Sequence, residues 1–307
     1  MQPLLVLEQG LNGVQFGVML FLMAAGLTLV FGIMNLINLA HGSLYMIGAY
    51  VCAYVFQASG SFVLGIGSAL AAAVLVGIVI EVVVFRALYT REHLDQVLAT
   101  FGLILFFDEM VRIIWGPTAL YASVPEFLSG QVEILPGAPF PSYRLAIIVV
   151  GLVVALLLYL LVAKTRLGML IRAGASNRVI VGALGVNVTL LYTFVFALGA
   201  ALAAFSGLMA GPIFTVESGM GENVLILAFV VIVIGGIGSI RGAFVASLLV
   251  GIVDTMGRAF LRPLLATVMA PAAADNAGPA LASMLIYILM ATVLFFRPQG
   301  LFPSRVS

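Results

Sequence analysis

The sequence contains little charge, since only 8% of its 307 residues are Asp, Glu, Lys or Arg. Soluble domains carry about 25% of such residues. The 13 basic and 12 acidic side chains leave a net charge of +1, which offers no basic surface for nucleic acid. Hydrophobic residues make up 64% of the chain. This composition excludes an ordinary soluble protein and predicts membrane spans, each of which needs roughly 20 apolar residues.

Residues that bind metals or perform covalent catalysis are also scarce. Cys52 is the single cysteine, and His41 and His93 are the only histidines, so an intramolecular disulfide is excluded and no metal site is expected. The only lysine, Lys164, does not end a glycine-rich phosphate loop. The sequence has no GxSxG elbow and no HExxH helix. We therefore expect a non-catalytic chain without a cofactor of its own.

Long apolar runs are what the sequence has in abundance. The stretch GGIGSIRGA, between the seventh and eighth runs, reads either as a tight turn or as a break in one long element. We therefore predict an all-α integral membrane protein in one domain over residues 1–307, a polytopic helical bundle of about eight or nine transmembrane helices with Gly-interrupted segments. The expected spans lie near residues 10–33, 37–58, 62–85, 95–116, 144–163, 188–210, 223–240, 243–261 and 280–296.

The distribution of Lys and Arg among the short loops predicts the orientation of the chain. Basic residues gather in the loops 86–94 and 164–187 and in the tail, at Arg297 and Arg305. The opposite set of loops carries Glu or no charge in most positions: 117–143, 211–222 and 262–279. We expect the N-terminus outside and the C-terminus in the cytoplasm. The first apolar run has no basic residue before it, so we expect its helix to be retained rather than cleaved.

Glycine, with 33 residues, exceeds its average share of roughly 7%. It recurs with Ala and Ser inside the spans, which favours helices packed at close range. The alternative is that Gly-interrupted segments are broken helices lining a path. Two such segments, AHGSLYMIGAY (40–50) and GGIGSIRGAF (235–244), lie in corresponding halves of the chain. An internal duplication would explain them.

Polar side chains within the spans are costly and usually face protein or water. The densest group, Asn35, Asn38, His41 and Ser43, lies between the first two spans. These side chains could bind a substrate, cap a helix end or hold two half-helices together. Capping or packing is the more common role at a kink.

Charged residues near the span ends form short-range pairs. Arg112 follows Asp108 and Glu109 at helical spacing, and Arg258 follows Asp254 by four residues. We expect intrahelical ion pairs at these positions, and the alternative is a proton or ion relay. Glu81 lies near the cytoplasmic end of its span, where we expect its side chain to reach water.

The segment 165–187 is basic, rich in small residues and too polar to span a membrane. Leu167, Leu170 and Ile171 recur at helical spacing. They predict a short amphipathic helix that lies on the membrane surface or docks into a partner. Gly182 and Gly185 mark where the segment turns back toward the membrane.

Several stretches resemble the branched-chain amino acid permeases of ABC importers, the LivH-type subunit. The first, GLTLVFGIMNLINLAHGSLYMIGAY (26–50), resembles the signature of that family. The resemblance continues in the right order through LATFGL (98–103), TRLGMLIRAGASNRVIVGALGV (165–186), AFVVIVIGGIGSIRGAFVASLLVG (228–251) and RPQGLF (297–302).

The resemblance implies a multi-pass subunit in a bacterial inner membrane that pairs with a second homologous permease. Two cytoplasmic ATP-binding subunits, which bind ATP and Mg, and a periplasmic solute-binding protein would complete the importer. Segment 164–187 then corresponds to the loop that contacts the ATPase. Relatives often carry an acidic residue where this chain has Ser176 and Asn177. The residues implied in this contact are Arg166, Gly168, Arg172, Ala175, Asn177 and Gly185.

The same resemblance implies leucine, isoleucine and valine as substrates. Other amino acids, urea and short amides are alternatives within the family. A stand-alone secondary transporter with Asp108, Glu109 or Asp254 as coupling acids is the competing class, but it does not explain the ordered resemblance. Near the translocation path we expect Asn38, His41, Gly42, Ser43 and Gly48.

Overall fold

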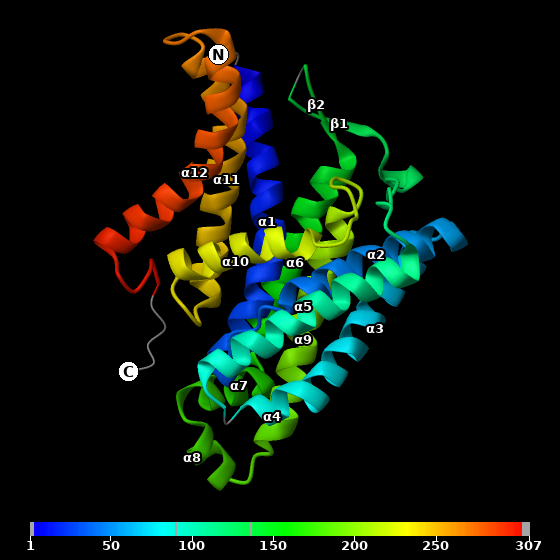
Figure 1. Ribbon diagram of the computed structural model, residues 1–307, viewed down its shortest axis with the longest axis vertical. Coiled ribbons are helices and arrows are strands. Elements are labelled where there is room, and N and C mark those ends of the chain that lie inside the picture. Colours follow the sequence, from blue (N-terminus) through cyan, green and yellow to red (C-terminus); the bar gives the residue numbers. More distant parts are fainter. Residues whose placement is uncertain (1–2, 90, 136, 303–307) are drawn as a thin grey trace.

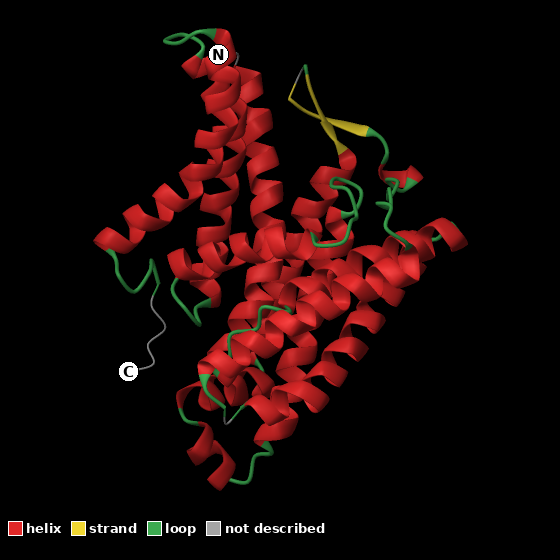
Figure 2. Ribbon diagram, viewed as in Figure 1, coloured by secondary structure: helices red, strands yellow, loops and turns green. Residues whose placement is uncertain are grey.

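The computed structural model describes residues 3–89, 91–135 and 137–302, and this part of the chain is almost entirely helical (Figure 2). Within these ranges nine helices have 16 residues or more. They are α1 (Pro3–Met34), α2 (His41–Ser59), α3 (Phe62–Ile80), α5 (His93–Trp115), α6 (Ser142–Lys164), α9 (Val188–Ala210), α10 (Met220–Gly235), α11 (Ile240–Leu265) and α12 (Pro271–Phe296).

Six helical segments of the described chain are long and apolar enough to cross a membrane, and α10 is a shorter apolar helix. A span is helical because no water reaches its backbone inside a bilayer, so each peptide group must find its partner within the helix. The predicted all-α, polytopic membrane protein is confirmed.

Short elements connect the long helices. They are η1, a π-helix (Glu81–Phe85), α4 (Arg86–Leu88), η2, a 3-10 helix (Glu126–Leu128), β1 (Gln131–Leu135), β2 (Ala138–Pro141), α7 (Arg166–Ser176) and α8 (Arg178–Ala183). The strands β1 and β2 pair as an antiparallel hairpin, with Val132 opposite Phe140. The segment 117–143, which was expected only as a loop, therefore contains this hairpin.

The elongated molecule has two distinct ends (Figure 1). The β1–β2 hairpin, the N-terminal end of α1 and the turn between α11 and α12 lie together at one end, which we call the hairpin end. Helices α7 and α8 lie at the opposite end, which we call the α7–α8 end. Helix α1 runs from the hairpin end toward α7, and α10 crosses the middle of the molecule.

Helix α1 forms the centre of the bundle, where it packs against α9, α11, α10 and α6. Of its most apolar stretch 83% is buried, against 11% for α12. Glycines allow the close approach, because a Cβ on Gly17 would lie 2.8 Å from the Cα of Leu248 and one on Gly13 2.8 Å from the Cα of Ile252. The prediction of closely packed helices is confirmed at these positions.

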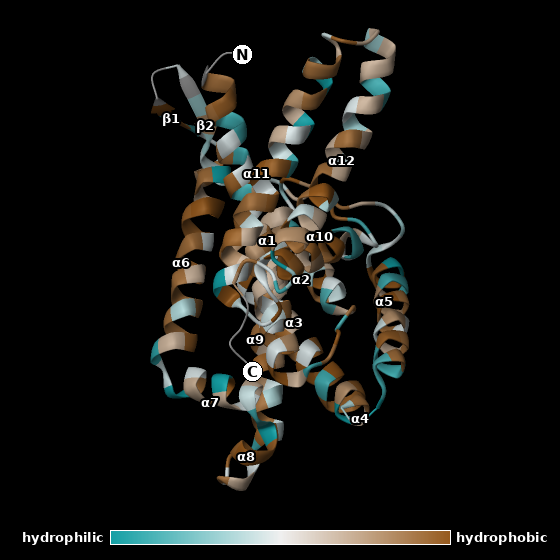
Figure 3. Ribbon diagram, turned by 90° about the vertical axis from the view of Figure 1, so that its left-hand side faces the viewer, coloured by the Kyte–Doolittle hydropathy of each residue, from teal (hydrophilic) through white to brown (hydrophobic). Residues whose placement is uncertain are grey.

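Helix α6 consists mostly of hydrophobic residues (Figure 3). Leu156 and Leu157 are more than half exposed. An outward-facing apolar surface suits lipid, which solvates hydrocarbon side chains as well as a protein core does.

The connections that precede and follow α11 are both short. The loop expected at 262–279 is mostly helical, since α11 runs to Leu265 and α12 begins at Pro271. Proline suits this place because its fixed φ fits the first helical turn and its missing N–H is not needed there. The GGIGSIRGA stretch is a tight turn between α10 and α11, where Gly236 and Gly238 have φ values of 101° and 81°.

Candidate functional site

The chain breaks between α1 and α2 and doubles back into the bundle. Asn35, with a φ of 52°, is the only non-glycine residue of the described chain with positive φ. After residues 35–40, His41 begins α2 so deep that a Cβ on Gly26 would lie 2.8 Å from its Nε2. The interruption expected within 40–50 therefore precedes residue 41, and His41–Ser59 is one continuous helix.

Polar side chains at this break are completely buried. His41 and Asn38 are both 0% exposed, and Ser43 is 4% exposed. The His41 ring faces the backbone of Met23, yet neither its nitrogens nor the Asn38 amide form a hydrogen bond of ordinary geometry with any described residue. An unpaired buried polar group costs roughly 1–3 kcal/mol of folding free energy. Such a cost needs an explanation, and a function of these two side chains in another state of the protein would provide one.

Two helices begin against each other beside this break. A Cβ on Gly42, in the first turn of α2, would lie 2.6 Å from the carbonyl oxygen of Gly221, in the first turn of α10. Farther along α2, a Cβ on Gly48 would lie 2.5 Å from the Cα of Ala204 in α9. Both glycines serve close backbone contact rather than bending of α2.

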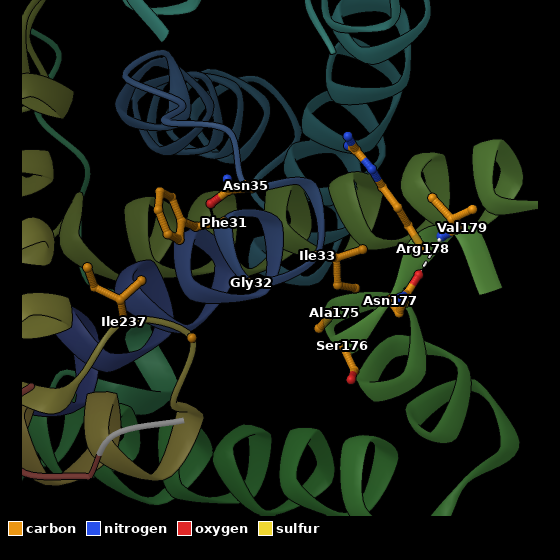
Figure 4. A pocket seen from close by; sticks show the side chains of 12 residues that line it. Phe31, Gly32, Ile33, Asn35, Ala175, Ser176, Asn177, Arg178, Val179 and Ile237 are labelled. Carbon is orange, nitrogen blue, oxygen red and sulfur yellow. Dashed lines mark hydrogen bonds between the residues drawn. The ribbon is translucent and has the colours of Figure 1, made fainter. Parts of the chain in front are cut away.

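A cavity of about 530 Å³, lined by apolar and polar residues, opens at the α7–α8 end (Figure 4). Phe31, Ile33 and Asn35 from the end of α1 line one side of it, and residues 174–179 line another. Two residues singled out for the ATPase contact, Ala175 and Asn177, line this cavity, whereas Arg166, Gly168, Arg172 and Gly185 do not.

The segment 164–187 folds into α7, α8 and two caps. Thr165 Oγ1 accepts a hydrogen bond of 3.1 Å from the Gly168 N–H and so caps α7. Asn177 Oδ1 accepts from Val179 N–H at 3.1 Å and from Ile180 N–H at 3.0 Å and so caps α8. The predicted short amphipathic helix is confirmed as α7.

Both ends of this segment expose side chains to their surroundings. Arg166 and Arg172 are exposed, and Arg172 also donates to the carbonyl of Val162. In and just after α8, Val179 and Leu184 are 75% and 77% exposed. Gly185, with a φ of 86°, makes the expected turn into α9.

A second cavity, of about 780 Å³ and lined by charged, polar and apolar residues, lies toward the hairpin end. Asn12 and Gln15 of α1, Arg144 of α6, Glu217 and Asp254 are among its lining residues. The sequence did not predict this cavity, because its lining side chains come from distant segments. The only signal was the presence of polar residues inside apolar runs, such as Asn12 and Gln15.

The predicted ion pairs are confirmed at two places. Arg112 contacts Glu109 at 3.3 Å, and Arg258 contacts Asp254 at 2.9 Å. The expectation that Glu81 reaches water is wrong, because its side chain is fully buried.

The π-helical turn at Glu81–Phe85 places the Glu81 carboxylate inside the protein. It accepts hydrogen bonds from Tyr89 Oη at 2.8 Å, from Thr193 Oγ1 at 2.7 Å and from Arg86 Nε at 3.3 Å. Burial and the bond to Glu81 raise the pKa of the Tyr89 phenol far above its ordinary value. Such π-turns inside α-helices occur frequently at functional sites, and this one links the end of α3 to α9.

Arg305, one of the basic tail residues, lies outside the described residues.

Comparison with known proteins gives matches over nearly the whole chain. Residues 10–294 match the family described as the branched-chain amino acid transport system / permease component. The high-affinity branched-chain amino acid transport system permease protein BraD of Pseudomonas aeruginosa is 30% identical, over 96% of this chain and 95% of BraD. LivH of Escherichia coli, a permease protein of the same description, is 30% identical over 85% of this chain and 88% of LivH. The probable LivH of Methanocaldococcus jannaschii is 28% identical over 78% of this chain and 76% of its own length. No solved structure matches the chain significantly.

Proposed function

Because the chain belongs to the family of permease components of branched-chain amino acid transport systems, we propose that it forms the translocation path of an ATP-driven importer for leucine, isoleucine and valine. The importer lies in the bacterial inner membrane. The observation that carries the proposal is the pair of cavities along α1, each lined by polar and apolar residues, one around residues 9–16 and one around residues 31–35. The nearest lining residues on α1 are Phe16 and Phe31, which lie about 22 Å apart along a helix that rises 1.5 Å per residue.

The layer between the two cavities is closed and contains the residues assigned to the path. The cavity toward the hairpin end, which we call the outer cavity, is lined by Tyr45 and Met220 where it approaches the contact of Gly42 with Gly221. Asn38, His41, Gly42, Ser43 and Gly48 belong to this layer. In an open state the unpaired groups of Asn38 and His41 would meet water or the polar part of the substrate, which accounts for their retention in a closed one.

The coupling segment 164–187 transmits the action of the ATPase. ATP and Mg bind to two separate cytoplasmic subunits, and this chain performs no catalysis. The exposed arginines Arg166 and Arg172 and the exposed apolar side chains of α8 provide the docking surface. Since α8 leads through Gly185 into α9, and α9 packs against α1, α2 and α3, a displacement of α8 moves the core of the bundle as in a rigid-body switch.

The distribution of charge supports the orientation. Arg166, Arg172 and Arg178 lie at the α7–α8 end, which is then cytoplasmic. The hairpin end, with the N-terminus and Glu133, faces outward toward a periplasmic solute-binding protein. A second homologous permease pairs with this chain, and the C-terminus lies in the cytoplasm.

Uptake measurements test the proposal. Cells that express the chain with its neighbouring genes should take up labelled leucine, and uptake should disappear when the ATPase genes are removed. Urea uptake with the same dependence would keep the importer and change its substrate to a neutral amide. Leucine uptake that persists without any ATPase would overturn the proposal in favour of a stand-alone secondary transporter.

A further inference from the structure

The outer cavity carries side chains of both charges. Its lining includes Arg144 and Arg258 on the basic side and Glu217 and Asp254 on the acidic side. These residues come from α6, from α11 and from the segment between α9 and α10. A cavity of this size lies within the range of about 300–1,000 Å³ found for small-molecule sites.

Two of these charged side chains, Asp254 and Arg258, form an ion pair with each other. Asp254 is 5% exposed, and its two oxygens accept from Arg258 Nε at 2.9 and 3.0 Å. Both side chains of this ion pair line the cavity.

The other two charges are not paired with each other or with an opposite charge among the described residues. Arg144 donates through Nη1 to the Asn12 side chain, at 2.5 Å, and forms no ion pair with a described carboxylate. Glu217 forms no ion pair with a described cation. The cavity therefore offers one available cation and one available anion.

Apolar side chains complete the lining. The Phe16 ring of α1 packs edge-on against the Phe214 ring, with 6.2 Å between their centroids. Both rings line the cavity, together with Val224 and Leu227 of α10. A guanidinium, a carboxylate and an apolar wall in one cavity match the carboxylate, ammonium and aliphatic side chain of a free amino acid.

We propose that the outer cavity receives an amino-acid zwitterion, with Arg144 on its α-carboxylate, Glu217 on its α-ammonium and the Phe16–Phe214 pair beside its side chain. The inference rests on the proposed transport function and adds the residues that select the substrate. A neutral molecule such as urea can form hydrogen bonds to both groups but brings no charge to either, so the site favours amino acids over short amides.

Cysteine protection tests this site in the purified importer complex, without nucleotide and without the solute-binding protein. Thr215 lines the cavity and is exposed, so Thr215→Cys places a reactive thiol at the site. The native Cys52 is buried and contributes little labelling. Millimolar L-leucine should slow the reaction of this thiol with a charged thiol reagent several-fold. Leucinamide, 4-methylpentanoate and urea, which lack one or both charges, should leave the rate unchanged.

Charge variants in the Thr215→Cys background identify the recognising groups. Arg144→Gln and Glu217→Gln should each require at least tenfold more leucine for equal protection, because each removes a charged hydrogen-bonding partner of the ligand and tenfold corresponds to only about 1.4 kcal/mol. Arg144→Lys should restore part of the protection, which a variant that merely misfolds would not show. Arg112→Gln and Glu109→Gln are the matched controls, because these exposed residues of α5 do not line the cavity.

The outcomes separate this inference from the proposed function. Equal protection by urea and leucine, no protection at all, or charge variants that behave like the controls would overturn the zwitterion site, even if ATP-dependent leucine uptake is normal. Protection by leucine that depends on Arg144 and Glu217 would support the site, even if the energy source of transport proved to be different.

Discussion

The backbone of Gly42 meets the backbone of Gly221 where α2 and α10 begin. A side chain on either residue would overlap the other residue's carbonyl group. Both helices thus start at the same depth of the bundle, with the outer cavity on one side of their contact and the buried His41 beside it. The contact joins two helices that lie far apart in the sequence, since α2 begins at His41 and α10 begins at Met220.

Substitution of Gly42 by alanine should destabilise the protein. The new Cβ would lie 2.6 Å from the Gly221 oxygen, and such overpacking of a close contact costs typically 1–3 kcal/mol. We expect a lower Tm of the purified protein in lipid nanodiscs, and less ATP-dependent uptake.

Gly67→Ala is the matched control. Gly67 lies within α3, and no heavy atom lies within 4 Å of a Cβ built on it, so alanine should leave the Tm unchanged or raise it slightly because it favours the helix. If Gly42→Ala and Gly67→Ala gave the same Tm, the close contact of α2 with α10 would not exist in the membrane.

Much of the fold follows from the sequence because each span must satisfy its own backbone inside the bilayer. That requirement makes a long apolar run a helix, and it made the all-α bundle predictable. It says nothing about helix ends outside the hydrocarbon layer. The segment 262–279 was expected to be a loop, whereas Pro263 lies inside α11 and Pro271 starts α12.

The site was less predictable than the fold. The burial of Glu81 depends on a π-helical turn, which no periodicity indicated. The break before α2 could be located near Asn35 and His41, but the return of the chain to the level of Gly26 depends on tertiary packing. The outer cavity combines Arg144 with Glu217 from separate segments, and only the folded chain brings such side chains together.

Removal of the Glu81 carboxylate should be costly. In Glu81→Ala the donors of Tyr89, Thr193 and Arg86 lose a common acceptor inside the protein. Arg86 keeps access to water because 40% of its side chain is exposed, so the cost comes mainly from the donors of Tyr89 and Thr193 that are left without an acceptor, roughly 1–3 kcal/mol. We expect a marked fall in Tm, together with easier proteolysis between α4 and α5.

Glu109→Ala provides the comparison for Glu81. Glu109 also pairs with an arginine, but both side chains are more than half exposed, and such pairs contribute about 0–1 kcal/mol. Equal effects of the two substitutions on Tm would show that the Glu81 cluster is not buried as described.

The exposed apolar residues of the α8 region should be needed for coupling rather than for folding. Leu184→Glu changes a side chain that is 77% exposed, so the Tm of the isolated chain should stay within about 1 °C of the wild type, because exposed substitutions usually shift stability by less than 0.5 kcal/mol. Binding to the ATPase subunits and ATP-dependent leucine uptake should both fall.

Phe127→Glu is the control for Leu184→Glu. Phe127 is similarly exposed, at 72%, but belongs to η2 on the segment that leads to the hairpin. It should leave ATPase binding intact. Retained ATPase binding by Leu184→Glu would exclude this surface of α8 as the docking site.

Asn177 tests whether the cap of α8 matters for coupling. Its Oδ1 accepts from the N–H groups of Val179 and Ile180, and replacing a capping Asn by Ala costs typically about 1 kcal/mol. For a helix as short as Arg178–Ala183 that loss should be enough to unwind it. Asn177→Ala should therefore reduce ATP-dependent uptake while the Tm of the bundle changes little.

Asn177→Asp should behave differently, because a carboxylate accepts the same two hydrogen bonds and its charge is favourable at a helix N-terminus. It also introduces the acidic residue that relatives often carry in this region. We expect uptake by Asn177→Asp to equal that of the wild type, measured beside Asn177→Ala in proteoliposomes with the ATPase subunits present. If both variants lost uptake equally, the amide itself would contact the ATPase. If neither lost it, the cap of α8 would have no part in coupling.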